Sequence, residues 1–506
     1  MQAADAELRQ HLERPLSRGH VPADACTGAA GGAACGDLIR ISLALDRHGD
    51  VGTIADAGFD ASGCGASIAA GSAVVGLVRG APLLDAARVG SEQIASELGG
   101  LSAAKRHAAE LAADALHRAL GWAARRQARL AHAPRRTLVA MSGGVDSAVA
   151  ALVLAREGGE TVAVTLELWS DAENDGEASC CSAQAVRGAR TLAHGLGMPH
   201  FSIDLRAEFR AGVVDGWLSD HAAGLTPNPC VRCNGNVRLD AMLELGSRLG
   251  ADTLATGHYA RVSDGRLLRV ASDLAKDQSY VLSALAPDSL ARLRFPLGEL
   301  RKEQVRELAA QAGLDVARKP DSQDLCFLAG TRHADFLARH GGLGATPGPI
   351  LDERGALLGE HRGAHSYTVG QRHGLGLGGR EPLYVLHTDA QRNTVTVGPR
   401  EALLANGLPV RGLTLHRGGA CVDGVRVRSH GRLLSCRVEP DLAAGSHASA
   451  TVVLDEPAER TAPGQIACLY SGETVVGHGT IDAPPPLGAQ PTAGARPALA
   501  VAAAAT

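Results

Sequence analysis

The residues that could do chemistry begin with Ser142-Gly-Gly-Val-Asp-Ser147, a glycine-rich turn between an apolar, β-prone run and an amphipathic helical pattern. In a strand–turn–helix unit, the backbone N–H groups of such a turn and the positive end of the helix dipole face a phosphate. The two glycines let the backbone approach the anion closely, and the two serines offer hydroxyl donors. Asp146 is a natural Mg²⁺ ligand. No lysine follows the glycines, so the turn predicts a nucleotide phosphate site that is not a Walker loop.

Three cysteines form the second candidate centre. Cys230 and Cys233 lie three residues apart on a turn made rigid by two prolines, and Cys326 follows much later between two aspartates. A pair of this spacing could be a redox pair, half of a zinc site or a coincidence, and the adjacent cysteines at 180–181 have the wrong spacing to complete a zinc site. One pair plus one remote cysteine suits either covalent sulfur handling or a three-thiolate iron–sulfur cluster with one open iron.

Length and composition limit the class of protein. The chain has 506 residues, of which 45% are hydrophobic and 21% charged, so we expect a soluble protein of three or four domains. No apolar stretch is long enough to span a membrane and the start lacks a secretory pattern, so we expect a cytoplasmic location and no membrane partner. The net charge of −4 predicts that nucleic acid would bind through a local patch. One candidate patch is a stripe of basic side chains at alternate positions of an expected strand: Arg426, Arg428, His430, Arg432 and Arg437. The alternative is that this strand face is simply exposed to solvent.

Four regions and a tail can be drawn along the chain. Residues 1–131 form an N-terminal unit. Strands and helices alternate over 135–330, which predicts a doubly wound parallel sheet with its ligand at the carboxyl ends of the strands. Short β-rich runs predict a small central domain over 331–400 and a C-terminal antiparallel barrel over 401–482. Residues 483–506 are rich in proline and alanine and are expected to be disordered.

Six motifs in one order carry a resemblance to a known family. They are the glycine-rich turn, Thr226-Pro-Asn-Pro with Cys233-Asn234, Ala255-Thr-Gly-His-Tyr259, Lys276-Asp-Gln-Ser-Tyr280, Ser322-Gln-Asp-Leu-Cys-Phe327 and Tyr367-Thr-Val-Gly-Gln-Arg372. Together they resemble the bacterial tRNA-specific 2-thiouridylases, which thiolate the wobble uridine of tRNA. The first motif is similar to the pyrophosphate loop of N-type ATP pyrophosphatases. The resemblance runs from about residue 135 to residue 482.

The resemblance implies roles for particular residues. The ATP site would comprise Ala140, Met141, Ser142, Gly143, Gly144, Val145, Asp146, Ser147, Leu166 and Gly257, with Mg²⁺ on Asp146. The target base would meet Asn228, Pro229 and Cys230, and other tRNA contacts would come from His258, Lys276, Asp277, Gln278, Arg428 and Gln465. Outside their motifs, Lys276 could be a solvated surface charge and His258 a satisfied core histidine.

Two chemical routes stay open under this resemblance. In the first, Cys326 carries a persulfide and Cys233 is the nucleophile that releases its sulfur, which ends in a disulfide between them. In the second, Cys230, Cys233 and Cys326 hold a 4Fe-4S cluster whose open iron carries sulfide. Cys230 stands where many relatives have aspartate, which favours the cluster, while Ser429 replaces a larger residue beside the tRNA-contacting Arg428.

The N-terminal unit is similar to the NifU-like scaffold on which iron–sulfur clusters are assembled. Cys35, Asp37, Cys64 and His107 match ligands of that family, but Ala108 takes the place of its third cysteine. The four side chains could hold zinc or iron, or the unit could be a degenerate docking module. We expect it to deliver sulfur or iron–sulfur, or to dock a cysteine desulfurase or another sulfur-relay donor.

Two other functions share parts of this pattern. An amide-forming ATP pyrophosphatase would use the phosphate loop and would have no use for Cys233 and Cys326. An ATP-sensing iron–sulfur carrier would bind metal and form no AMP when tRNA is added. The complete set of motifs favours the tRNA-uridine 2-sulfurtransferase over both.

Overall fold

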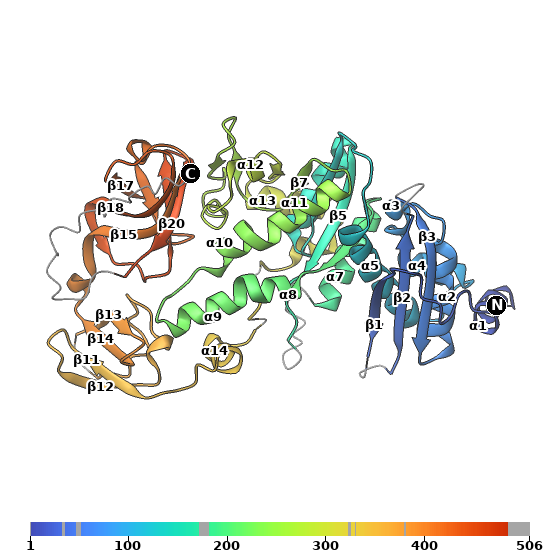
Figure 1. Ribbon diagram of the computed structural model, residues 1–506, viewed down its shortest axis with the longest axis horizontal. Coiled ribbons are helices and arrows are strands. Elements are labelled where there is room, and N and C mark those ends of the chain that lie inside the picture. Colours follow the sequence, from blue (N-terminus) through green and yellow to red (C-terminus); the bar gives the residue numbers. More distant parts are fainter. Residues whose placement is uncertain are drawn as a thin grey trace, which may run out of the picture.

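The computed structural model describes residues 2–32, 36–46, 52–171, 182–321, 325–328, 330–378 and 381–483. The expected disordered tail, Cys35 and the cysteines at 180–181 lie outside these ranges, apart from residue 483. The N-terminal unit occupies one end of an elongated molecule, the parallel sheet its middle, and two β-rich units the other end (Figure 1). Within the described ranges, no helix has the length and apolar character needed to cross a membrane.

The N-terminal unit is an antiparallel sheet covered by helices. Its strands are ordered β1-β2-β3: β1 (Cys26–Gly31), β2 (Leu38–Leu45) and β3 (Ile54–Ser62). The alternating apolar residues of β2 put Ile39, Ile41 and Leu43 into the core, fully buried. Its helices are α1 (Gln2–Glu13), α2 (Gly65–Val78), α3 (Leu83–Ala86), α4 (Ser91–Glu97) and α5 (Arg106–Arg126).

The middle unit is the doubly wound parallel sheet that the alternating pattern predicts. Its strands are ordered β10-β7-β4-β5-β6: β10 (Leu293–Arg294), β7 (Thr253–Ala255), β4 (Arg136–Ala140), β5 (Glu160–Glu167) and β6 (His200–Asp204). The first strand in the chain is central, so the loops after β4, β5 and β7 meet at one carboxyl edge, where such sheets bind ligands.

Helices surround this sheet. They are α6 (Val145–Glu157), α7 (Ala183–Gly195), α8 (Arg206–Phe209), α9 (Asp215–Ala222), α10 (Pro229–Cys233), α11 (Leu239–Arg248), α12 (Pro287–Leu290), α13 (Lys302–Gln311) and α14 (His333–Gly341). Two π-helical turns join them: Arg210–Val214 links α8 to α9, and Asn234–Arg238 links α10 to α11.

The remaining chain forms two β units, as expected. The first has strand order β12-β11-β14-β13: β12 (Leu357–His361), β11 (Gly348–Leu351), β14 (Thr394–Gly398) and β13 (Tyr384–Asp389). The second comprises β15 (Leu404–Leu415), β16 (Gly424–Arg426), β17 (Leu434–Glu439), β18 (Gly445–Glu459), β19 (Ile466–Ser471) and β20 (Thr474–Ile481). Pairing of β15 with β20 closes it into a barrel, to which the hairpin β8 (Arg261–Val262) and β9 (Leu268–Arg269) adds through β20.

The expected basic stripe on one strand is wrong. β16 ends at Arg426, and Arg428, His430 and Arg432 lie in the connection that follows it, while Arg437 lies on β17. Glycine and serine in this stretch favour a turn over a continued strand. These side chains therefore do not share one strand face.

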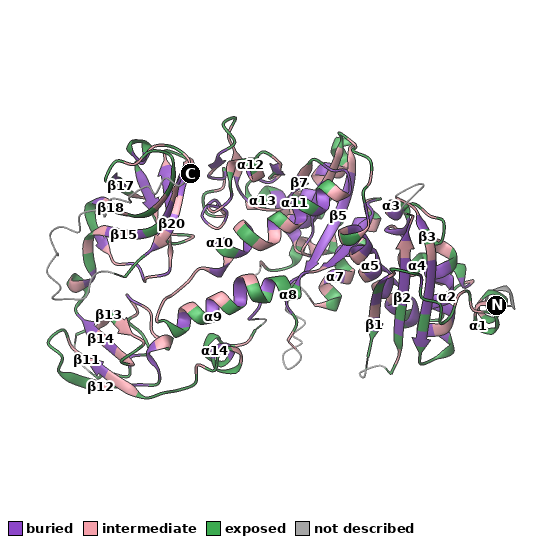
Figure 2. Ribbon diagram, viewed as in Figure 1, coloured by how far each residue is buried: buried purple, intermediate pink, exposed green. Residues whose placement is uncertain are grey.

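Helix α5 joins the N-terminal unit to the parallel sheet of the middle unit through one apolar core. It packs against β1 and β2 on one side and against β6 on the other, and the core contains Ile41, Leu116 and Ile203 together. Gly121 makes the close approach to β6 possible, because a Cβ there would overlap the carbonyl oxygen of Ser202. Figure 2 shows the buried band running from β2 through α5 to β5. The N-terminal unit and the middle unit thus share one continuous apolar core.

Candidate active site

The phosphate loop lies between β4 and α6, with Ala140 and Met141 buried at the end of the strand. Ser147 Oγ accepts a hydrogen bond from the Ser142 N–H at 3.1 Å and donates to the Gly144 carbonyl at 3.0 Å, which closes the loop. Gly143 has φ +71°, which other residues rarely adopt. No side chain of the described residues caps the N-terminus of α6. Its first N–H groups are therefore free to meet an anion.

Two neighbouring strand ends complete the nucleotide site. Gly257, in the loop after β7, faces the start of α6 so closely that a Cβ would lie 2.7 Å from Asp146 C and from Ser147 N. Leu166 lies near the end of β5, beside β4, and is 8% exposed. The structure therefore brings together the loop and Gly257, with Leu166 on the adjacent strand, as a nucleotide site requires.

The carboxylate of Asp146 is bound by residues that the sequence did not indicate. Lys302 Nζ donates to Asp146 Oδ1 at 2.7 Å and to Oδ2 at 2.8 Å, and the Tyr259 hydroxyl donates to Oδ1 at 2.9 Å. Burial, and then the charge of Asp146, raise the pKa of Tyr259. Lys319 Nζ also reaches the loop, where it donates to the Gly143 carbonyl at 3.0 Å. Lys302 lies 156 residues from Asp146 in the chain, and no local pattern marks it.

Asp321 is the second carboxylate of this network and lies five residues before Cys326. Lys276 Nζ and Lys302 Nζ approach it to 2.8 and 2.9 Å, and an Arg306 nitrogen to 2.9 Å. Partial burial would raise the pKa of Asp321, but the hydrogen bonds from Lys276 and Lys302 outweigh it and lower the pKa to about 2. Lys302 thus links the phosphate loop to the chain that leads to the third thiol.

The thiol pair lies on the short helix α10. Asn228 caps this helix by accepting from the N–H groups of Cys230 at 3.1 Å and Val231 at 3.4 Å, and Pro229 occupies its first turn. Cys230 is half-buried, and desolvation raises the pKa of its thiol. Cys233 is buried at the end of α10, directly before a π-helical turn, a feature that is frequent at functional sites.

Cys326 packs against the extended apolar core that runs through the N-terminal and middle units and also contains Cys233. It is half-buried, and the next residue, Phe327, is 2% exposed and meets Trp217 edge-to-face with ring centroids 5.1 Å apart. Among the described residues, no three Cys, His, Asp or Glu side chains converge closely enough to hold a metal ion. The expected cluster on Cys230, Cys233 and Cys326 is therefore not supported by their arrangement, and we derive no step through it.

The N-terminal centre is partly described. Asp37 accepts hydrogen bonds from the Cys64 N–H at 2.8 Å and the Ser67 hydroxyl at 3.0 Å, and Cys64 Sγ lies 3.4 Å from Asp37 Oδ2. The bond from the Cys64 N–H lowers the pKa of Asp37, and His107 adds a smaller effect of the same sign. Asp37, Cys64 and His107 do not converge as a metal site, and Cys35 lies outside the described residues.

Several candidate RNA contacts lie in the loop after β7 and in the segment after β9. Burial, together with Arg238, lowers the pKa of His258 to about 3, so its ring is neutral. Gln278 Oε1 accepts from the Tyr259 N–H at 2.9 Å. The structure corrects the expected tRNA contact of Asp277, because this side chain is buried and pairs with Arg426 at 2.6 Å. It joins the catalytic unit to the barrel, and its carboxylate does not face a surface that RNA can reach.

The barrel docks onto the middle unit through several hydrogen bonds, among them one from the Thr226 N–H to the Pro463 carbonyl at 2.8 Å. Gln465 Nε2 donates to the Thr226 carbonyl at 2.6 Å, and the Tyr280 hydroxyl donates to the Ile466 carbonyl at 3.0 Å. Gln465 therefore positions the loop that holds Asn228. Gln465 was expected to contact tRNA, but its side-chain amide is already bonded to the Thr226 carbonyl.

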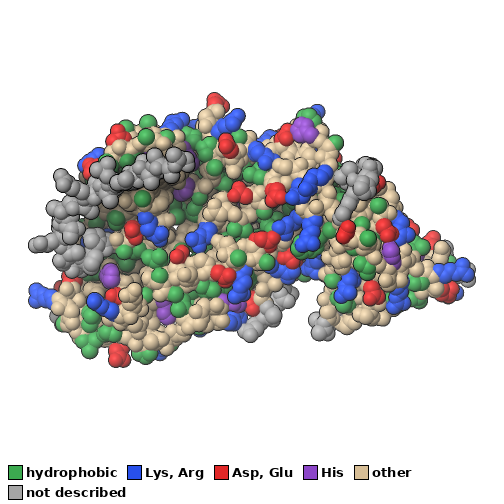
Figure 3. Space-filling view, viewed as in Figure 1, with side chains coloured by type: hydrophobic (Ala, Val, Ile, Leu, Met, Phe, Trp, Pro, Cys, Tyr) green, Lys and Arg blue, Asp and Glu red, His purple; other side chains and the backbone are tan. Residues whose placement is uncertain are grey.

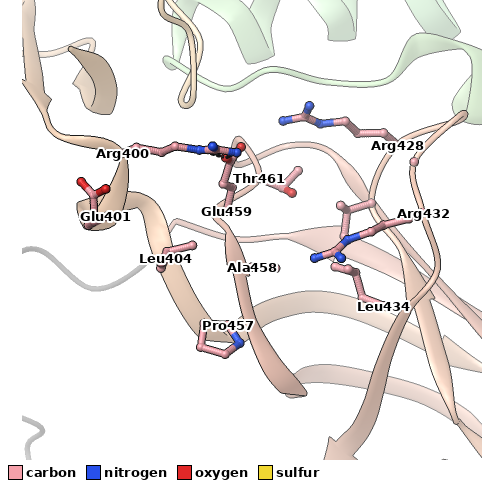
Figure 4. A pocket seen from close by; sticks show the side chains of 12 residues that line it. Arg400, Glu401, Leu404, Arg428, Arg432, Leu434, Pro457, Ala458, Glu459 and Thr461 are labelled. Carbon is pink, nitrogen blue, oxygen red and sulfur yellow. Dashed lines mark hydrogen bonds and ion pairs between the residues drawn. The ribbon is translucent and has the colours of Figure 1, made fainter. Parts of the chain in front are cut away.

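Arg428 lies on a cavity of about 640 Å³ beside this junction. Figure 4 shows Arg428 and Arg432 extending over the cavity, whereas Arg400 is paired with Glu459, with Nε and Oε1 2.6 Å apart. Elsewhere, blue basic and red acidic side chains are interspersed over the visible face (Figure 3), which agrees with the net charge of −4. A local patch that binds nucleic acid therefore stays a prediction, with Arg428 and Arg432 at this cavity as its candidates.

Family models match the chain in four consecutive parts. They are described as NifU-like N terminal domain (residues 5–129), tRNA methyl transferase HUP domain (135–330), tRNA methyl transferase PRC-barrel domain (334–399) and Aminomethyltransferase beta-barrel domain (418–481). The four descriptions agree with the architecture and confirm the predicted fold class.

Curated relatives match over nearly their whole length. "Bifunctional protein NifU/MnmA" of Rubrobacter xylanophilus is 42% identical over 485 residues, which cover 93% of this chain and 97% of the relative. "tRNA-specific 2-thiouridylase MnmA" of Thermobifida fusca is 45% identical over 354 residues, or 68% of this chain and 95% of the relative. The protein of the same description from Geobacter metallireducens is 41% identical, over 69% of this chain and 98% of its own.

Proposed function

The chain belongs to the family of bacterial tRNA-specific 2-thiouridylases, in the form that carries an N-terminal NifU-like domain, and from this premise we propose how its residues perform the reaction. It is a tRNA-uridine 2-sulfurtransferase. We take the substrate to be the wobble uridine, whose C2 oxygen must be replaced by sulfur. The carbonyl oxygen at C2 is a poor leaving group, so the reaction must first convert this oxygen into a better one.

Activation is adenylation by ATP. The uridine O2 attacks the α-phosphorus, and the bond to pyrophosphate breaks. The loop N–H groups at the start of α6, Ser142 and Ser147 bind the departing pyrophosphate and stabilise its charge. The oxygen donors of Asp146 suit Mg²⁺, which would neutralise phosphate charge there. The uridine then carries AMP at C2, which is a good leaving group.

Sulfur transfer uses the two thiols of the shared apolar core. The terminal sulfur of a Cys326 persulfide bonds to C2 of the activated uridine. The Cys233 thiolate then attacks Cys326 Sγ, which breaks the persulfide S–S bond and forms a Cys233–Cys326 disulfide. The transferred sulfur keeps the electron pair of the broken bond, AMP leaves C2, and an external thiol must reduce the disulfide before the next cycle.

One observation carries this proposal. Asp321, five residues before Cys326, is tied to Asp146 of the phosphate loop through Lys302, and Cys233 and Cys326 both pack in one extended apolar core. This ion-pair link supports a site in which adenylation and sulfur donation are coupled. An amide-forming synthetase or an ATP-sensing carrier has no need of two thiols in that position.

The test is single-turnover thiolation of tRNA by anaerobic protein loaded with persulfide, with ATP present. We expect Cys233→Ala and Cys326→Ala to abolish 2-thiouridine, while Cys421→Ala, which removes an exposed barrel thiol, retains it. AMP formation on tRNA should survive in Cys233→Ala, because adenylation precedes sulfur transfer. Thiolation that persists without Cys233 or Cys326 contradicts the persulfide route.

Recognition of tRNA is proposed for Lys276, His258, Gln278 and Arg428. Gln465 acts indirectly, by holding the Thr226 carbonyl two residues before Asn228. Asn228, Pro229 and Cys230 would meet the base itself. Lys276→Ala should weaken tRNA binding and reduce its salt dependence, since one phosphate contact is lost.

The N-terminal unit is proposed to supply the sulfur, either by carrying it at Cys64 or by docking a cysteine desulfurase or another sulfur-relay donor. Because Asp37, Cys64 and His107 do not converge as a metal site, no metal is placed on them here. Deleting residues 1–131 is a poor test, because it removes α5 from the catalytic core. Cys64→Ser and His107→Ala leave α5 in place. We expect both to lower the Cys326 persulfide measured by mass spectrometry in cells, and unchanged loading would show that the unit has no part in supply.

A further inference from the structure

One ammonium group serves two carboxylates that belong to different parts of the site. Lys302 Nζ lies 2.7 Å from Asp146 Oδ1 and 2.9 Å from Asp321 Oδ1. Its side chain is only 11% exposed, so solvent screens these interactions weakly. The reaction as described needs Asp146 at the nucleotide and assigns no chemical step to Lys302 or Asp321, which only connect its two parts.

The two carboxylates differ in what else holds them. Asp321 has two further cations, Lys276 at 2.8 Å and Arg306 at 2.9 Å. Asp146 has the hydroxyl of Tyr259, which is neutral, as its second bound group. Asp146 therefore depends on Lys302 for its counter-charge, and a second cation at Asp146 must compete with this ammonium.

We propose that Lys302 senses the nucleotide: it neutralises Asp146 in the empty site and yields that place to the divalent cation that accompanies ATP. Repulsion between the two cations moves the ammonium toward Asp321 and the phosphates. The stronger hold on Asp321 fixes the chain at this residue, five positions before Cys326. ATP binding thereby positions the sulfur-carrying thiol before the sulfur is transferred. The inference rests on the proposed role of Asp146.

A first test measures binding of Mn²⁺ alone, by electron paramagnetic resonance, to the full chain without nucleotide. In Lys302→Met the competing ammonium is gone, and Mn²⁺ should bind about tenfold more tightly. Arg306→Met is the matched control, because it removes a cation from Asp321 and leaves Asp146 paired. Its Mn²⁺ affinity should equal that of the wild type. Unchanged or weaker Mn²⁺ binding in Lys302→Met would overturn the proposal.

A second test measures the rate at which iodoacetamide alkylates Cys326, read by mass spectrometry of its peptide, with and without Mg-ATP. Mg-ATP should change this rate by about fivefold in the wild type, the low end of usual coupling between sites. The change should persist in Arg306→Met and vanish in Lys302→Met and Asp321→Asn, with thermal unfolding used to confirm that all four proteins are folded.

A wild-type rate that ignores Mg-ATP, or a normal response in Lys302→Met, would overturn the proposal. Neither test uses tRNA or sulfur transfer. Lost coupling with intact thiolation would therefore refute this inference alone, and intact coupling without thiolation would refute the proposed function alone.

Discussion

A methyl group added at Gly257 should damage ATP binding through the backbone of the phosphate loop. Its Cβ would lie 2.7 Å from Asp146 C and Ser147 N, and 2.9 Å from Asp146 O. Non-bonded carbon atoms prefer about 3.5–4.0 Å, so the start of α6 must move by roughly 1 Å. These atoms belong to the backbone and cannot rotate away, as the end of a side chain would.

The size of the effect follows from what moves. Overpacking of this kind costs about 1–3 kcal/mol of stability. The displaced N–H groups are those that would bind phosphate, and a hydrogen bond to a charged group is worth about 1.5–3 kcal/mol. We therefore expect Gly257→Ala to raise the Kd for ATP by about 10–100-fold, as the loss of one such bond implies.

The assay is calorimetric titration with ATP, with thermal unfolding of the same samples. The control is Gly188→Ala in α7, where an added Cβ meets nothing within 4 Å. Removing a glycine from a helix interior stabilises by about 0.5–1 kcal/mol, so this variant should bind ATP normally and unfold no earlier. If Gly257→Ala binds ATP as tightly as the wild type, the close approach of this loop does not matter to the nucleotide.

Three further changes test the packing around the site. Arg426→Met leaves the buried Asp277 carboxylate without its cation, and the free energy of unfolding in urea should fall by about 3–5 kcal/mol. The control is Arg437→Met at an exposed ion pair, which should lower this free energy by less than about 1 kcal/mol. Equal losses in the two variants would refute the reasoning. Burial, and then two neighbouring histidines, lower the pKa of His221 to about 3, whereas the unfolded chain takes up this proton below about pH 6.5. The free energy of unfolding should thus fall as pH drops below about 6.5, and His221 should account for about 2 kcal/mol of this loss at pH 5. In His221→Gln, the free energy measured by urea unfolding should depend less on pH between about 6.5 and about 5. An unchanged pH dependence would mean that the ring is protonated in the folded protein. Gly121→Ala pushes α5 away from β6 and should lower the Tm in differential scanning calorimetry, and an unchanged Tm would mean that the two units are not joined as tightly as their packing indicates.

The parallel sheet and the phosphate loop could be predicted because their signals are local. Buried parallel strands are continuous apolar runs, so the alternation expected over 135–330 is found as strands such as Glu160–Glu167 and helices such as Ala183–Gly195. The Ser-Gly-Gly turn marks both the end of β4 and the start of α6. Each of these features depends on a few consecutive residues, which a single sequence contains.

The partners of these residues could not be predicted, because they come from distant parts of the chain. Lys302 and Asp146 meet across 156 residues, and Asp277 and Arg426 across 149. Lys302 has the sequence context of an ordinary exposed helix start. Asp277 lies within an RNA-contact motif, and burial turns it into a structural ion pair. Long-range pairing decides whether a charge meets solvent, substrate or another charge.

Helix α5 changes what the N-terminal fusion can do. A domain on a flexible linker could carry sulfur from Cys64 to Cys326 by swinging between them. Here α5 belongs to the cores of both units, and Figure 1 shows α2, which follows Cys64, and α10, which ends at Cys233, on opposite sides of α5. Separating the units would expose the apolar surface between α5 and β6, and this exposure costs a free energy of roughly 25 cal/mol for each Å². A swing of the N-terminal unit therefore does not fit this packing, and the proposed sulfur supply requires a separate carrier between the N-terminal centre and Cys326.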